Sequence, residues 1–278
     1  MLCFIPIFIS RKRSYSTINR LKYFISQRAA SLLFIIFYFA LFFIRRNFFV
    51  FLIMFKIGMP PFQRWIISII SVLNVGEIYL LLSIQKFIPI VILSHLVREK
   101  VVIFFLLVSI VLVLSYVKYL TSLIIILFIS SVINSMWVIG SIVGGGWFIY
   151  FFTYCLILGG LVISLWILNV KKIADLKEGE ILVKIITSFH LFNIGGVPPI
   201  LGFIIKLLLL LKLFNVRLIF IGVLLFSSFV LLIIYTLLIY QVVCISPSLN
   251  RFNKEKSEHI VFVVIITFGL IIWPIWLV

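Results

Sequence analysis

The sequence is poor in charged residues, and poorest in acidic ones. Only 11% of its 278 residues are charged, with 7 aspartates and glutamates against 24 lysines and arginines. Soluble domains carry roughly 25% charged and about 45–50% apolar residues, whereas 65% of this chain is hydrophobic. This shortage of polar surface excludes a water-soluble particle of this size, so lipid is the expected solvent for most of the chain.

Cysteine and histidine are also scarce, with 3 of each. They are isolated from one another along the chain: Cys3, Cys155, Cys244, His95, His190 and His259. Metal sites need such ligands at close, regular spacing, so the sequence predicts no metal site. The apolar start Met1–Ser10 has no basic residues before it and no small-residue cleavage site after it, so no cleavable signal is predicted.

The apolar runs are long and continuous. A membrane β-barrel would alternate apolar and polar residues along short strands, which runs such as Val101–Val117 and Ser122–Val143 do not do. Because a helix needs about 20 apolar residues to cross a bilayer, we predict an all-α polytopic transmembrane helical bundle of about nine to ten spans. After the short stub Met1–Ser10, the expected spans are 21–44, 47–66, 70–97, 100–118, 120–142, 146–170, 180–214, 217–244 and 259–277. Two are overlong and discontinuous, since Pro89 interrupts one and Gly195–Pro199 the other.

The net charge of +17 carries information about topology. In a soluble protein it would point to nucleic acid, but membrane proteins gather lysine and arginine in the loops of one side. When the loops are assigned alternately to the two sides, the side that holds Arg11–Arg13, Lys171, Lys172 and Arg251 is the more basic one. We expect this side to face the matrix or the cytoplasm.

The ionisable groups inside the apolar runs are the candidates for function. A lysine at the centre of a span costs roughly 2.5–3.5 kcal/mol on insertion scales, whereas one near a helix end extends its head group to the interface. We therefore set aside the lysines near the ends of expected spans: Lys22, Lys118, Lys184 and Lys212. Lys56, Lys86 and Lys206 remain, and each lies beside a helix-breaking glycine or proline.

A buried lysine beside a break in a helix has a specific use. Proline removes one backbone hydrogen bond, and the freed carbonyls need water or another donor. Lysine has a reference pKa of about 10.4, which burial lowers, so a buried lysine can load and release a proton near neutral pH. Broken spans with such groups are typical of proteins that move ions across a bilayer. The alternative is that the lysines only tie down kinked helices.

Glu77 is a candidate carboxylate partner for these lysines. It precedes Lys86 by nine residues on the same expected span, which is about two and a half turns. The two therefore lie on opposite faces, and a lysine of a neighbouring helix is the better partner. The alternative places Glu77 near the membrane surface beside Asn74.

Four segments carry a resemblance to a known family. In chain order, Leu21–Ser31 resembles KYF-x-x-Q-x-x-x-S, Phe55–Trp65 resembles K-x-G-x-x-PF-x-x-W, Gln85–Ile90 resembles QK-x-x-PI, and Gly195–Lys206 resembles GG-x-PP-x-x-GF-x-x-K. Together they are similar to the antiporter-like membrane subunits of mitochondrial respiratory complex I, and among these to the NADH-ubiquinone oxidoreductase chain 2 family. The similarity runs from the first residue to about Phe214 and thins beyond it.

The resemblance implies a single transmembrane antiporter-like domain over residues 1–278 that translocates protons. In the family, the lysine that corresponds to Lys56 pairs with a glutamate of an earlier helix. The lysine matching Lys86 lies in the middle of the proton path, and the one matching Lys206 lies towards its outlet.

The resemblance also implies where the redox chemistry takes place. NADH, flavin, iron–sulfur clusters and quinone belong to partner subunits, so this chain is expected to bind no cofactor. The expected partners are the other membrane-arm subunits and lipid such as cardiolipin in the mitochondrial inner membrane, and no nucleic acid is expected. The basic loops are expected on the matrix side.

The chain departs from the family pattern at two places. The family's glutamate would fall before Met1, so we expect a shortened N-terminal helix or a start further upstream, and Glu77 could replace the lost partner of Lys56. In addition, Ile124–Ile125 stands where many members carry Arg-Lys, and Asn134 lies near the place of a family histidine. The relay roles of those groups do not carry over to this chain.

Two other functions stay open at this point. An independent cation/proton antiporter would share the broken helices and the buried lysines, but it would work outside a large complex. A structural subunit that packs and no longer pumps would fit the absence of the family's glutamate.

Overall fold

The computed structural model describes residues 14–40, 46–70, 73–96, 99–116, 122–167, 181–198, 200–214 and 218–243, together with Ile173 and Leu176. Regular structure within these ranges is helical. The stub Met1–Ser10, the basic run Arg11–Arg13 and the expected span 259–277 lie outside the described residues. The chain divides into two compact units, Met1–Ser115 and Tyr116–Val278, and each is described by itself.

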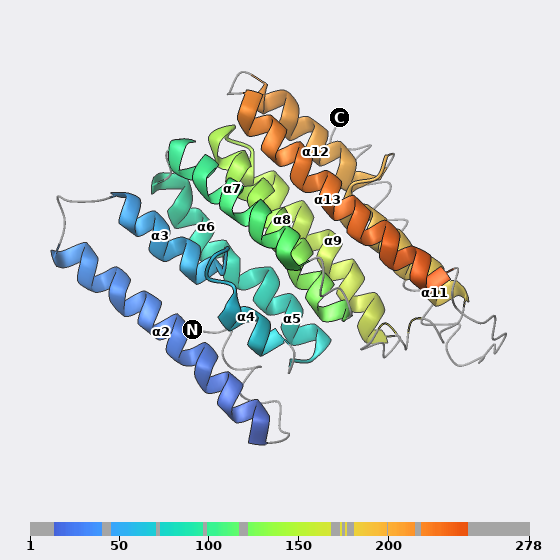
Figure 1. Cartoon of the computed structure of the whole chain (residues 1–278), viewed down its shortest axis with the longest axis horizontal. Helices are drawn as coiled ribbons and strands as arrows, with labels where there is room; N and C mark the ends of the chain where they lie inside the picture. The colour runs from blue at the N-terminus through green and yellow to red at the C-terminus, as the bar shows by residue number, and fades with distance from the viewer. Residues whose placement is uncertain are drawn as a thin grey trace. The chain divides into compact units, whose positions relative to one another are not determined.

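The first unit contains six described helices (Figure 1). They are α2 (Ser14–Ala40), α3 (Arg46–Ile57), α4 (Arg64–Ile70), α5 (Val75–Leu82), α6 (Ile84–Leu96) and α7 (Glu99–Tyr116). Helix α2 packs against α3 and α4, and α3 packs against α6. The two segments that carry Lys56 and Lys86 are therefore neighbours within this unit.

The expected span 47–66 is not one helix, because α3 ends at Ile57. Gly58 has a φ of 75°, and the N–H groups of Gly58 and Met59 bond to the carbonyls of Phe55 and Met54 at 3.1 and 3.0 Å. This is the Schellman end of a helix, in which the residue after the last turn takes a left-handed conformation that glycine adopts without strain. Lys56 consequently lies in the last turn of α3.

The expected span 70–97 is discontinuous, but the break lies at Ser83 and not at Pro89. Ser83 is the C-cap of α5, with φ −116° and ψ −77°, and its hydroxyl donates to the carbonyl of Tyr79 at 2.5 Å. Pro89 lies inside α6. A proline cannot donate to the carbonyl four residues back, here that of Gln85 at the second position of α6.

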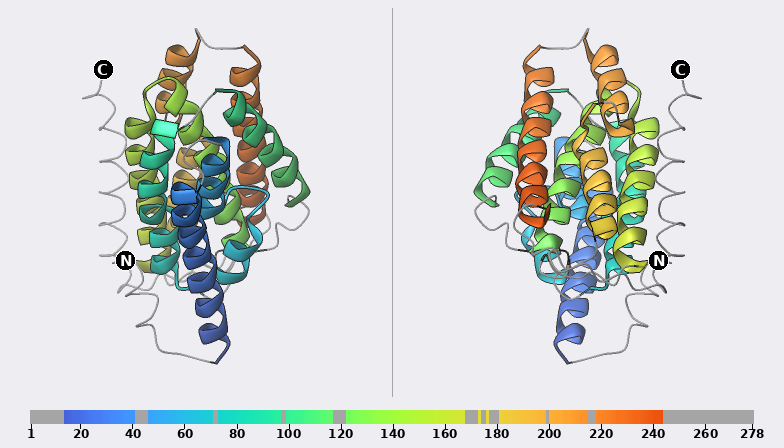
Figure 2. Two further views of the ribbon diagram at one scale, coloured as in Figure 1. Left: turned by 90° about the vertical axis from the view of Figure 1, so that its left-hand side faces the viewer. Right: turned by 90° about the vertical axis from the view of Figure 1, so that its right-hand side faces the viewer.

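The second unit contains five described helices, of which α8 is the most buried. They are α8 (Leu123–Val143), α9 (Trp147–Ile167), α11 (Ile181–Gly195), α12 (Leu201–Leu213) and α13 (Leu218–Val243). Helix α8 packs against α9, α12 and α13. Its apolar segment is 89% buried, compared with 39% for the apolar segment of α13. Figure 2 shows α11 and α12 following one another along nearly one line.

The break between α11 and α12 repeats the helix ending found after α3. Gly196 has a φ of 81°, and its N–H donates to the carbonyls of Asn193 and Phe192, while the N–H of Val197 also reaches Phe192. Two half-helices therefore replace the single expected span 180–214, as the Gly195–Pro199 segment predicted.

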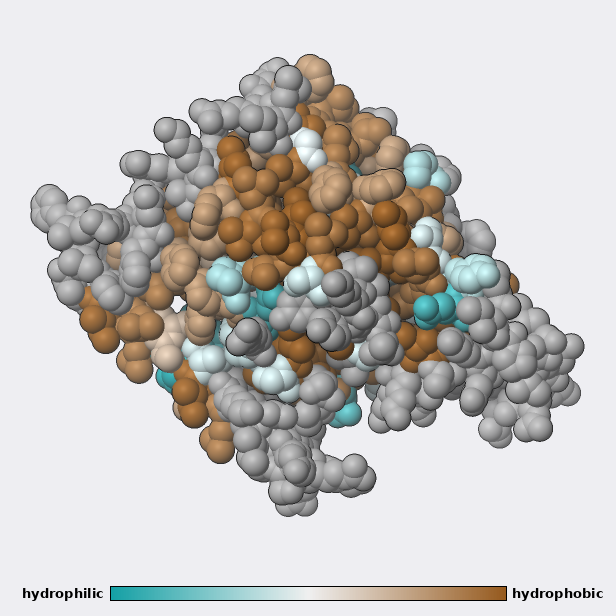
Figure 3. All heavy atoms as spheres, in the orientation of Figure 1, coloured by the Kyte–Doolittle hydropathy of each residue, from teal (hydrophilic) through white to brown (hydrophobic). Residues whose placement is uncertain are grey.

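The outer surface suits an apolar solvent. Four described segments are long and apolar enough to cross a membrane: Val75–Leu96, Ile125–Val143, Trp147–Trp166 and Phe220–Val242. Exposed large apolar side chains recur along α13, at Leu225, Phe226, Phe229, Ile233 and Leu237. Figure 3 shows that apolar side chains cover most of the described part of one face. The chain is a multi-pass membrane protein.

We predict that Gly202→Ala destabilises the break between α11 and α12. A Cβ at this position would overlap the backbone carbonyl of Asn193, and overpacking of this kind costs about 1–3 kcal/mol. The matched control is Gly222→Ala in α13, where a Cβ meets nothing within 4 Å and alanine favours the helix. Thermal unfolding of the detergent-extracted protein should show a lower midpoint for Gly202→Ala only, and equal midpoints would contradict the close approach.

Candidate functional site

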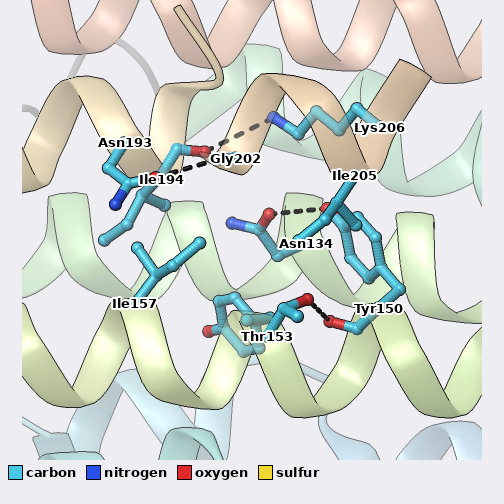
Figure 4. A pocket seen from close by; sticks show the side chains of 10 residues that line it. Asn134, Tyr150, Thr153, Ile157, Asn193, Ile194, Gly202, Ile205 and Lys206 are labelled. Atoms are coloured by element: carbon cyan, nitrogen blue, oxygen red, sulfur yellow. Dashed lines mark hydrogen bonds between the residues drawn. The ribbon is translucent and has the colours of Figure 1, made fainter. Parts of the chain in front are cut away.

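A small cavity with a few polar groups in its lining lies inside the second unit, between the half-helices and α8 and α9. It offers about 20 Å³ to the centres of water molecules, and ten residues line it: Asn134, Tyr150, Thr153, Tyr154, Ile157, Asn193, Ile194, Gly202, Ile205 and Lys206. About 10–15 Å³ of such space holds one water. Figure 4 shows Asn134, Tyr150 and Thr153 on one side of the cavity and Asn193, Gly202 and Lys206 on the other.

Lys206 is the cationic residue of this cavity. Its side chain is 6% exposed, and its Nζ donates to the carbonyl oxygens of Gly195 at 3.0 Å and Ile194 at 3.4 Å. These are the last two residues of α11, where a helix leaves its carbonyls unpaired and carries partial negative charge. The Lys206 ammonium of α12 therefore caps the C-terminus of α11.

The indole of Trp137 covers the same ammonium from α8. The Nζ of Lys206 lies 5.7 Å from the ring centroid, within the range of a cation–π contact. Trp137 is fully buried, with 1% exposure. Residues of α8, α11 and α12 thus surround one amine. Trp137 lies far from Lys206 in the sequence, so the motif that contains Lys206 does not reveal this contact.

Asn193 joins the two half-helices beside the cavity. Its Oδ1 accepts a hydrogen bond from the N–H of Gly202 at 3.0 Å, which satisfies one of the free donors at the start of α12. Its Nδ2 is buried and has no hydrogen-bond partner among the described residues. This amide is therefore a donor in the cavity lining that is available to a small polar molecule.

Asn134 and Tyr150 connect α8 with α9 on the opposite side of the cavity. The hydroxyl of Tyr150 donates to Asn134 Oδ1 at 2.9 Å, and Asn134 Nδ2 donates to the carbonyl of Ser130 at 2.8 Å. The sequence drew attention to Asn134 only as a departure from a family motif. Its role as a cavity residue depends on the packing of α8 against α9, which no motif in either segment reveals.

Lys86 and Lys56 belong to the first unit. Lys86 is 5% exposed and is the third residue of α6, directly after the break at Ser83. Lys56 is half-buried in the last turn of α3, and its carbonyl accepts from the side chain of Gln27 at 3.4 Å. Both lysines lie beside helix breaks, as expected, although the break next to Lys86 is the one at Ser83.

Glu77 lies in the first turn of α5, where its Oε2 accepts a hydrogen bond from the N–H of Asn74 at 3.0 Å. A carboxylate here caps the helix and lies at the positive end of its dipole. This contact gives Glu77 a local structural role beside Asn74. Its role as partner of a lysine stays a prediction.

Two of the lysines that were set aside, Lys212 and Lys184, differ in burial. Lys212 is exposed near the end of α12, as expected for a lysine that extends to the interface. Lys184 does not extend to the interface in this way, because its side chain is only 7% exposed in the first turn of α11. Position near a helix end was therefore a poor guide to the burial of this side chain.

No group of three or more histidine, cysteine, aspartate or glutamate side chains that could hold a metal ion occurs in the described part of the chain. The site is therefore built from an amine, amides and hydroxyls. Such a set can bind water and exchange protons with it.

The fold resembles two solved membrane proteins. A chain of respiratory complex I from Thermus thermophilus, solved with bound aureothin, superposes with a TM-score of 0.77 at 16% identity, covering 96% of this chain and 69% of that one. A chain of the Mrp complex from a Dietzia species gives 0.67 at 14% identity, covering 84% and 52%. The fold and its broken helices define an antiporter-like, polytopic membrane protein.

Sequence comparison identifies the family. The NADH-ubiquinone oxidoreductase chain 2 of Artemia franciscana is 32% identical over 218 residues, 74% of this chain and 67% of that protein. That of Rhipicephalus sanguineus is 28% identical over 272 residues, 94% and 86% of the two chains. No family model matches the sequence. The chain belongs to the NADH-ubiquinone oxidoreductase chain 2 family.

We predict that Tyr150→Phe weakens the packing of α8 against α9. The change removes the donor to Asn134 Oδ1, and leaving a buried acceptor unpaired costs about 1–3 kcal/mol. Tyr240→Phe is the control, because Tyr240 is 59% exposed on α13. The midpoint of thermal unfolding should fall for Tyr150→Phe and stay unchanged for Tyr240→Phe; a fall of equal size in both would show that the hydroxyl bond contributes nothing specific.

Proposed function

We propose that the chain is a proton-translocating membrane-arm subunit of respiratory complex I in the mitochondrial inner membrane. Its family and the likeness of its fold to a chain of complex I support the assembly. The observation that carries the proton function is Lys206, a buried ammonium held by the end of a half-helix in a cavity with room for water.

The geometry around Lys206 suits a group that gains and loses a proton. A protonated amine donates to the carbonyls of Ile194 and Gly195 and lies against the ring of Trp137. When it releases a proton to water in the cavity, these contacts weaken together. The amides of Asn134 and Asn193 can orient that water, since both line the cavity.

Lys86 and Lys56 complete the proposed relay. Lys86 resembles Lys206 in being almost fully buried beside a break in a helix. Lys56 is less buried and lies at the end of α3. Glu77 is the proposed carboxylate partner of a lysine in this part of the chain, in addition to its capping contact.

The remainder of the enzyme is assigned to partner subunits. Electron transfer from NADH to ubiquinone, with its flavin and iron–sulfur clusters, takes place in other chains, and this chain couples to it by moving protons. The exposed apolar side chains of α13 suit contact with neighbouring membrane subunits or with lipid such as cardiolipin.

An independent cation/proton antiporter is the second candidate. The likeness to a chain of the Mrp complex favours it at the level of the fold. The two functions differ in assembly, since a subunit of complex I is isolated only with the other subunits, whereas a transporter works alone. Purification under mild detergent with identification of the associated chains separates them.

We predict that Lys206→Met lowers the number of protons pumped per electron in the assembled complex. Loss of a proton-carrying group slows transfer by about 10²–10⁴-fold, so pumping through this chain should nearly cease. Lys212→Met is the matched control, because Lys212 lies on the same helix and is exposed. The measurement compares acidification of closed vesicles with NADH oxidation; an unchanged ratio for Lys206→Met would contradict the proposal.

Lys206→Arg separates proton transfer from a structural role. Arginine can donate to the same carbonyls, but it stays protonated at all physiological pH values. We expect Lys206→Arg to assemble and to lose the same share of proton pumping as Lys206→Met. Normal pumping by the arginine variant would show that a fixed positive charge suffices, and it would support a structural subunit.

A further inference from the structure

Helix α11 carries buried polar residues at every third position. They are Lys184, Thr187, His190 and Asn193, with exposures of 7, 3, 0 and 0%. Residues three apart on a helix are neighbours on its surface, so these side chains form a stripe that winds around α11. Its two ends, Lys184 and Asn193, lie on opposite faces of the helix. Nine residues of helix rise about 14 Å, which takes the stripe from the first turn of α11 to the last.

His190 is the unexplained member of the stripe. Its side chain is fully buried, and neither ring nitrogen has a hydrogen-bond partner among the described residues. A buried polar group without a partner costs about as much as a lost hydrogen bond. The two ring nitrogens therefore either stay without hydrogen bonds in the folded protein or bind small polar molecules, such as water, that enter the helix bundle.

Helix geometry places His190 next to the cavity that contains Lys206. Asn193 and Ile194, which both line that cavity, follow His190 by three and four residues, so they lie one turn further on the same face. Asn193 in turn bonds to Gly202 at the start of α12, one turn before Lys206. The stripe thus ends at the cavity from which Lys206 exchanges its proton.

We propose that His190 is a further proton-carrying residue, which connects the Lys184 end of α11 with the Lys206 cavity. This inference rests on the proposed proton function of the chain. Nothing in the motifs that singled out Lys56, Lys86 and Lys206 includes His190, and its sequence position shows only an isolated histidine in an apolar run.

The imidazole ring suits the step because it has two nitrogens. One nitrogen accepts a proton from water on the Lys184 side, and the other releases its own proton to water on the Asn193 side. Only N–H and O–H bonds form and break, and the ring regains its starting charge after each transfer. A return to the starting tautomer follows by rotation of the ring or by exchange of protons with water.

The experiment measures protons pumped per electron in vesicles that contain the assembled complex. The variants are His190→Leu, which removes both nitrogens, and His190→Gln, which keeps a buried polar group that cannot carry a proton. His95→Gln is the control, because His95 is exposed on α6. Each variant is also combined with Lys206→Met, and the amount of intact complex is measured for all of them.

The proposal predicts that both His190 variants lose the same share of pumping as Lys206→Met, with no further loss in the double variants and none in His95→Gln. Normal pumping by both variants would overturn it. A loss in His190→Leu alone, or failure of both to assemble, would make His190 a structural residue and would also overturn it. If Lys206→Met itself pumps normally, the proposed proton function fails, whatever the His190 variants show.

Discussion

The contact between the Lys206 ammonium and the end of α11 is the constraint on which the second unit depends. The carbonyls of Ile194 and Gly195 have no partner within their own helix, and the amine of α12 supplies the donor. Without that donor, two carbonyls would stay buried and unpaired in an apolar surrounding, which is costly in a protein solvated by lipid. The break between α11 and α12 and the position of Lys206 beside the cavity therefore depend on one another.

The same physical device recurs where the sequence combines lysine with a helix break. Gly58 and Gly196 end α3 and α11 in the same way, each with a positive φ, and Lys86 follows the break at Ser83. Broken helices leave polar backbone groups inside the apolar interior, and buried amines and water can satisfy them. The amine that satisfies the backbone groups at a break is therefore also the group proposed to hold a proton.

The parts of the structure that depend on local sequence were predictable. Glycine after a helix and proline beyond it predicted the break next to Lys206, and burial of that lysine followed from the apolar runs around it. The same residue types follow Lys56, but the segment 47–66 was expected to be one span, and the end of α3 at Ile57 was not predicted. The break at Ser83 was not predictable, because serine carries no strong stop signal and Pro89 drew attention downstream. Asn134, Tyr150, Asn193 and Trp137 came together only through the packing of three helices, α8, α9 and α11. The burial of Lys184 was not predictable, because its neighbours along the chain do not show what covers it.

The central claim is that Lys206 exchanges a proton while the complex turns over. Infrared difference spectroscopy on complex with isotopically labelled lysine tests it most directly, with Lys206→Met identifying the signal of this one residue. The account predicts that the ammonium bands of Lys206 decrease and return in step with electron transfer. Bands of Lys206 that stay unchanged between the resting and the working complex would contradict it.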